Sequence, residues 1–127
     1  MKMLHRWELE WTTVITSDTA EVVVPMGNYQ RTSPGATSAR GWLEMRAEEG
    51  SIQVACSVTL ANDVTAAGTA TKVNSLVSTE GVSDPSTAVT VTSAFQGNKY
   101  VRPSFNIKSG DGNMAAARVR GWIEVWQ

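Results

Sequence analysis

Cysteine and histidine are nearly absent from this chain of 127 residues, which contains one of each, Cys56 and His5. A single thiol excludes an internal disulfide, and one thiol with one imidazole cannot complete a Cys/His zinc site. The sequence therefore predicts no metal site and no cofactor. Cys56 is predicted to be a small hydrophobic residue of the core, and His5 is predicted to be a solvated residue near the start of the chain.

Charged side chains are also scarce. They make up 18% of the residues, and neither sign dominates, because 11 basic residues stand against 12 acidic ones. Binding to a phosphate backbone normally requires a basic patch or stripe, so the sequence predicts no nucleic-acid partner. The polar residues are mostly Ser, Thr, Asn and Gly, and a surface of this kind is weakly charged and prone to association.

Long apolar runs are missing as well. The first eight residues, MKMLHRWE, lack the apolar stretch of a secretion signal. No uncharged apolar stretch approaches the roughly 18 residues that a membrane-spanning helix needs. We therefore expect a protein that is made in the cytoplasm and has no membrane partner.

Patterns of catalytic residues are equally lacking. The serines show no nucleophile-elbow pattern, and no glycine-rich phosphate loop precedes a helix. Asp111 and Asn113 lie in a glycine-rich segment, but the further acidic ligands of a calcium loop are missing, so a turn is predicted there. We nominate no catalytic residue and expect that the protein is not an enzyme.

What the chain does contain is period-two alternation of apolar and polar residues, interrupted by turn residues and typical of antiparallel strands. The predicted strands are residues 6–15, 21–24, 39–47, 52–60, 71–77, 86–95, 101–107 and 115–126. A chain of this length matches one domain. Residues 1–127 are therefore predicted to form a single all-β domain, an antiparallel β-sandwich of about eight strands that is jelly-roll-like.

Two local features make more specific predictions. The turn residues 48–51 between two alternating segments predict a β-hairpin formed by residues 39–47 and 52–60. Pro103 has no backbone N–H to donate to a neighbouring strand, which predicts an edge position or a bulge. The N-terminal and C-terminal strands both carry tryptophan, and we expect them to pair with each other.

The most informative feature is a repeated segment. Residues 39–46 read ARGWLEMR and residues 119–126 read VRGWIEVW, 80 positions apart. Strand alternation assigns the Gly, Leu/Ile and Met/Val positions to the core. It assigns six residues to the outward face, where we expect any interface or ligand to bind: Trp42, Trp122, Arg40, Arg120, Glu44 and Glu124.

Three interpretations of these six residues remain open. They could form a cross-strand ladder that stabilises an exposed sheet, a protein interface, since Trp and Arg are enriched at binding hot spots, or a platform on which sugars stack. Glu44 and Glu124 could also lie close together as in glycoside hydrolases. Arginines on the same face make salt-bridged scaffolding the favoured role for both carboxylates.

A small all-β chain rich in Ser, Thr and Gly, without a catalytic set, resembles the head-decoration and other accessory structural proteins of tailed bacteriophages. The resemblance covers the whole chain in length and composition. It implies a virion protein that binds a capsid or tail lattice and stabilises it through protein–protein contacts. The expected partners are further copies of the chain and a larger protein shell; the alternative is a carbohydrate-binding module that uses surface Trp and Arg.

Overall fold

The protein is described from a computed structural model, in which residues 2–16, 20–32, 35–65, 68–92, 95 and 99–127 are placed. These residues form ten strands and no helix, in agreement with the predicted all-β class. No helix in this described part of the chain is long and apolar enough to cross a membrane. The strands are β1 (Met3–Ile15), β2 (Val22–Pro25), β3 (Gln30–Arg31), β4 (Ser38–Glu49), β5 (Ser51–Ala61), β6 (Thr69–Thr79), β7 (Ser83–Pro85), β8 (Val89–Thr92), β9 (Tyr100–Ser109) and β10 (Ala115–Trp126).

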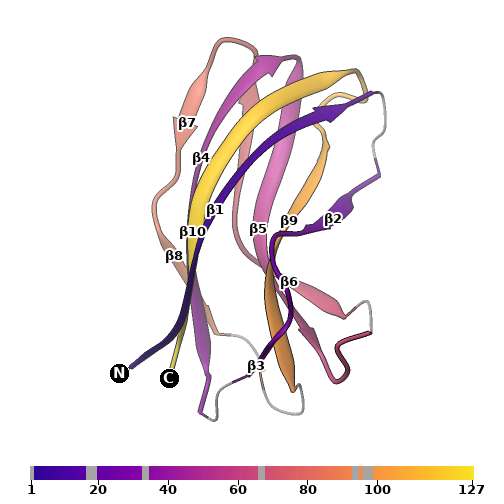
Figure 1. The fold of residues 1–127 in the computed structure, drawn as a ribbon. Helices are drawn as coiled ribbons and strands as arrows, with labels where there is room; N and C mark the ends of the chain where they lie inside the picture. The colour runs from indigo at the N-terminus through magenta and orange to yellow at the C-terminus, as the bar shows by residue number, and fades with distance from the viewer. Residues whose placement is uncertain (1, 17–19, 33–34, 66–67, 93–94, 96–98) are drawn as a thin grey trace.

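The strands form two antiparallel sheets packed face to face (Figure 1). One sheet has the order β1-β10-β4, with both β7 and β8 paired to β4; the other has the order β9-β5-β6, with both β2 and β3 paired to β9. If β2 and β3 are counted as one interrupted strand, and β7 and β8 as another, the ten strands of the described residues become eight. The result is two four-stranded sheets connected as a jelly roll, as the alternation predicts.

The terminal strands pair as expected, but the predicted hairpin is wrong. β1 runs antiparallel to β10 along nearly its whole length, so the two ends of the chain lie side by side (Figure 1). In contrast, β4 and β5 belong to different sheets. Gly50 turns the chain from one sheet to the other with a φ of 67°, and a Cβ there would overlap the carbonyl oxygen of Met114. Alternation and turn residues do not distinguish such a corner from a hairpin.

Pro103 does not lie on an edge strand. β9 is internal, between β5 and the β2/β3 segments. The Met26 N–H donates to the Pro103 carbonyl at 2.9 Å, which places the backbone of Pro103 toward the break between β2 and β3. The missing N–H of the proline faces that same side, since both polar groups of a strand residue point to one neighbour. The strand formed by β2 and β3 is therefore interrupted at the point where Pro103 has no N–H to donate to it.

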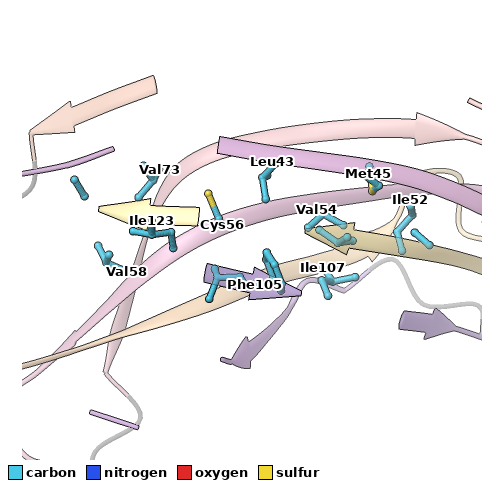
Figure 2. Close-up of a cluster of buried hydrophobic side chains, with 14 of the residues drawn as sticks. Leu43, Met45, Ile52, Val54, Cys56, Val58, Val73, Phe105, Ile107 and Ile123 are labelled. Carbon is cyan, nitrogen blue, oxygen red and sulfur yellow. The ribbon is translucent and has the colours of Figure 1, made fainter. Parts of the chain in front are cut away.

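The core lies between the sheets and is filled by side chains from both (Figure 2). Phe105 is fully buried, and its ring stacks on Trp11 of β1 at a centroid distance of 6.5 Å. Cys56 is also fully buried, as predicted, and its burial raises the pKa of the thiol to about 12. A thiol in this state packs as a small apolar group and does not act as a nucleophile.

Candidate functional site

The two copies of the repeated segment lie in neighbouring strands, β4 and β10, which run antiparallel at the centre of their sheet. The register places Trp42 directly opposite Trp122. Because the segments run in opposite directions from this point, the Arg of each copy lies opposite the Glu of the other, Arg40 opposite Glu124 and Glu44 opposite Arg120. The repetition therefore creates a two-fold pattern of complementary cross-strand pairs.

The glycine of each copy has a packing role on the inner side of the same strands. Gly121 lies opposite Leu43, and a Cβ at Gly121 would overlap the carbonyl oxygen of Trp42. A Cβ at Gly41 would lie 2.8 Å from the sulfur of Cys56 and 2.9 Å from Cγ1 of Val73. Glycine is thus needed where β4 and β10 approach each other and the opposite sheet, which explains why it recurs in both segments.

β1 adds a third strand to this outward face. Its register with β10 places Arg6 opposite Glu124, Glu8 opposite Trp122, and Glu10 opposite Arg120. The face consequently has three rows that cross β1, β10 and β4 in that order. We call these nine residues the ladder face; its first row is Arg6, Glu124 and Arg40, its middle row is Glu8, Trp122 and Trp42, and its third row is Glu10, Arg120 and Glu44.

All six residues singled out in the sequence therefore lie together on one face. Sequence reasoning missed Arg6, Glu8 and Glu10, although the signal was available. Their alternation with the apolar residues of the first strand assigned them to an outward face. The expected pairing of the terminal strands would have placed that face beside the repeated segment.

Ion pairs cross the first and third rows. Arg6 Nη1 lies 2.5 Å from Glu124 Oε2, and Arg6 Nη2 lies 2.7 Å from Glu8 Oε1. The hydrogen bond to Glu8 is the main reason why the pKa of Arg6 rises above its usual value. Arg120 Nη2 lies 2.6 Å from Glu44 Oε2. The side chains of Glu8 and Arg120 are mostly exposed, those of Arg6 and Glu44 are 38% and 30% exposed, and that of Glu124 is 10% exposed.

The two tryptophans differ in their surroundings. The ring of Trp122 has the guanidinium carbon of Arg6 at 4.9 Å and that of Arg40 at 5.5 Å, both in cation–π geometry. Both Trp42 and Trp122 are half-buried and line an open depression of about 510 Å³. Carboxylates from β1 and the guanidinium of Arg120 line the same depression. Both rings thus border open space, but of the two only Trp122 has guanidinium groups of the described residues over its ring.

The carboxylates do not form a hydrolytic pair. Glu44 lies in the third row and Glu124 in the first, four positions apart in the register. This offset corresponds to roughly 13 Å along the strands, with the tryptophan row between them. Each carboxylate is also ion-paired to an arginine, so the salt-bridged arrangement expected for both is the one observed.

Two other candidates have structural roles. Oδ1 of Asp111 accepts a hydrogen bond from the Asn113 N–H at 3.0 Å, which holds the pKa of Asp111 below its usual range. This is the predicted turn, and no group of three potential metal ligands occurs among the described residues. His5 is not fully solvated: its ring stacks on Trp7 at 5.4 Å, nearly parallel, and the residue is half-buried.

The outer face of the other sheet is built differently. Ser57 Oγ donates to Asn106 Oδ1 at 2.7 Å, and Asn106 Nδ2 donates to Glu21 Oε1 at 2.7 Å. Lys72 Nζ donates to Glu21 Oε2 at 2.7 Å; this hydrogen bond, with that from Asn106, lowers the pKa of Glu21. We call the buried polar residues here the polar strip: Ser57, Thr59, Ser104 and Asn106, from β5 and β9.

Comparison with known proteins gives no family model and no curated relative. Solved structures do share the fold. The structure of the Gx strain of infectious bursal disease virus matches with a TM-score of 0.63 at 9% identity, over 95% of this chain and 32% of that chain. The VP2 subviral particle of the same virus matches with a TM-score of 0.60 at 9% identity, over 95% and 32% of the two chains.

A third match, T=1 particles derived from infectious bursal disease virus, has a TM-score of 0.58 at 14% identity and covers 95% of this chain and 31% of that chain. At such identities the likeness is one of fold. The chain spans about a third of the length of the solved chains it matches. The likeness agrees with the general resemblance to virion structural proteins, and it does not single out tailed bacteriophages.

Proposed function

We propose that this chain is a structural protein of a virus particle and that it acts by decorating or stabilising a protein shell through protein–protein contacts. One observation carries the proposal: nearly the whole chain, 95%, superposes on chains of solved virus particles. The matched part is about a third of each of those chains.

The ladder face supports this function. Protein interfaces favour Trp and Arg, with hot spots near the centre of the contact. In the ladder face two tryptophans occupy the middle row and arginines occupy the flanking rows. We assign this face to contact with a second copy or with the shell, and we assign no catalytic step, cofactor or nucleic-acid partner. The chain would be made in the cytoplasm and become part of the virion.

Purified particles provide the test. Virus particles from cells that carry the gene are isolated on a density gradient, and the 13.7 kDa chain is measured in every fraction by quantitative mass spectrometry. We expect the chain to co-migrate with particles in a fixed ratio to the main shell protein. If the chain remains in the soluble fractions, with no enrichment in the particle band, the proposal is wrong.

Carbohydrate binding is a second candidate, favoured by the open depression beside Trp42. An indole next to carboxylates and a guanidinium can stack on a sugar ring and bind its hydroxyls. Trp122 is less suitable because two guanidinium groups already lie over its ring. A glycan array, followed by fluorescence titration, tests this function. Binding that is lost in Trp42→Ala but kept in Trp122→Ala would support it, and no response to any glycan would eliminate it.

A further inference from the structure

We propose that the ladder face binds the ladder face of a second copy of this chain, about a two-fold axis that lies across the strands at the tryptophan row. The inference rests on the proposed function in one respect, the assignment of this face to a protein contact. It goes further by naming the partner, the axis and the residues that meet.

The charges of the first and third rows are opposite at every position. Along β1, β10 and β4 the first row reads Arg, Glu, Arg, whereas the third row reads Glu, Arg, Glu. On β4 and β10 this inversion results from the antiparallel pairing of the repeated segment. On β1, Arg6 and Glu10 continue the same inversion, although this strand does not carry the repeat.

A two-fold axis across the strands uses this inversion. It places the first row of one copy on the third row of the other, strand by strand. Arg40 then faces Glu44 of the second copy. In the same way Arg6 faces Glu10 of the second copy, and Glu124 faces Arg120 of the second copy.

An axis along β10 would instead place each row on itself, with arginine on arginine and glutamate on glutamate. An axis along the strands midway between β10 and β4 would pair opposite charges on those two strands alone, and it would place Arg6 and Glu10 on the uncharged Thr90 and Pro85 at the far edge of the sheet. Only the axis across the strands gives opposite charges on all three strands.

The rows around these two also avoid like-charge contacts, with one exception. Next to the third row, Arg118 and Arg46 lie opposite each other. The axis places them on Trp126 and Ser38 of the second copy, which are uncharged. Within the middle row tryptophan faces tryptophan. The exception is Glu8, which faces its own equivalent at the sheet edge and is already paired to an arginine of its own chain.

The size of the contact indicates its strength. β1 and β10 arch over the second sheet, so the ladder face is convex along the strands (Figure 1). Close contact is then confined to the central rows, which span roughly 13 Å along the strands. Such a contact is smaller than the roughly 800 Å² per partner of standard interfaces. A weak dimer, dependent on concentration and weakened by salt, is expected.

Charge reversal of one predicted pair tests the geometry. Arg40→Glu alone places glutamate on glutamate twice about the axis, and Glu44→Arg alone places arginine on arginine twice. An equimolar mixture of the two variants restores opposite charges at both contacts. By sedimentation velocity over a concentration series, we expect each variant alone to dimerise at least about tenfold more weakly than the wild type, and the mixture to recover a heterodimer.

Controls keep the result specific. Arg31→Glu and Glu80→Arg make the same changes of charge at exposed positions away from the ladder face, and both should dimerise like the wild type. Circular dichroism shows whether every variant is folded. A dimer that neither ladder variant weakens would place the interface elsewhere, and a mixture that fails to recover would reject the axis. A wild type that stays monomeric at millimolar concentration would overturn the inference, whereas particle binding in the gradient experiment would still stand.

Discussion

The two outer faces of the sandwich satisfy their polar groups in opposite ways. On the sheet of β5 and β9, small side chains bond to one another within the chain, and the four residues of the polar strip are at most 5% exposed. On the sheet of β4 and β10, long charged side chains extend from the surface, and Arg120 is 65% exposed. One face is completed by the chain itself, while the other presents charged groups that a partner can still bind.

This difference predicts where stability and association reside. A buried hydrogen-bond network is costly to disrupt, because each orphaned group has lost its water. Exposed ion pairs contribute little, because water and salt compete with them. Substitutions in the polar strip should therefore affect folding, and substitutions in the ladder face should affect binding. The glycines beneath the ladder face are the exception, since they belong to the core.

The largest effect is expected beneath the ladder face. Gly121→Ala would place a Cβ against the carbonyl oxygen of Trp42, which forces β4 and β10 apart. We expect a loss of about 3 kcal/mol in the free energy of unfolding, at the upper end of the usual cost of overpacking. Urea denaturation followed by tryptophan fluorescence measures this loss.

Gly27→Ala is the matched control on the other sheet. A Cβ at Gly27 would have its nearest neighbour, Cγ of Pro103, at 3.5 Å, an ordinary contact. This variant should lose less than about 1 kcal/mol. Equal losses in the two variants would show that the close approach of β4 and β10 is not what requires glycine at position 121.

The next effect tests the polar strip directly. Asn106→Leu keeps the approximate side-chain volume but removes the acceptor of Ser57 and a donor to Glu21. The buried hydroxyl of Ser57 is then unsatisfied, and we expect a loss of about 2 kcal/mol by urea denaturation. A loss below about 0.5 kcal/mol would show that water replaces the amide, and that the strip is not closed as described.

The polar strip also shows what the sequence alone could not predict. Alternation places Ser57 and Asn106 on the side of their strands opposite the apolar residues, and such a position suggests contact with water. Both belong to a hydrogen-bond network with Glu21, which is 36 positions from Ser57 and 85 from Asn106. Pairings of this kind depend on the strand order, which a local pattern does not contain. The result is a buried hydrogen-bond network that no sequence motif indicates.

The repeated segment was more informative, because a local pattern does contain the information about which residues share a face. Its period-two pattern indicated which residues share a face, and the two copies turned out to be partners in one ladder. The all-β class and an antiparallel sandwich of about eight strands also followed from alternation and turn residues. The hairpin at Gly50 was wrong because a turn signal reports that the chain reverses, and it does not report in which sheet the next strand lies.

Acid should reduce the stability that Glu21 contributes through its hydrogen bond to the polar strip. The hydrogen bonds from Lys72 and Asn106 hold the pKa of Glu21 below its usual range, so folding favours the charged form. Its contribution is present above the unfolded pKa of about 4.3 and is lost as pH falls through the folded pKa. The stability difference between wild type and Glu21→Gln should therefore shrink from pH 7 to pH 3. A stability difference that is constant over this range would show that the charged carboxylate of Glu21 does not stabilise the network.

The smallest effect should come from the exposed pair Arg120 and Glu44. A double-mutant cycle with Arg120→Met, Glu44→Gln and the combined variant measures their coupling in the free energy of unfolding. We expect about 0.5 kcal/mol, reduced further in 1 M salt, because both side chains remain partly in water. The same substitutions should nevertheless weaken self-association in sedimentation velocity. A coupling above about 2 kcal/mol, with association unchanged, would show that the ladder face is internal scaffolding like the polar strip, and the contrast between the two faces would then disappear.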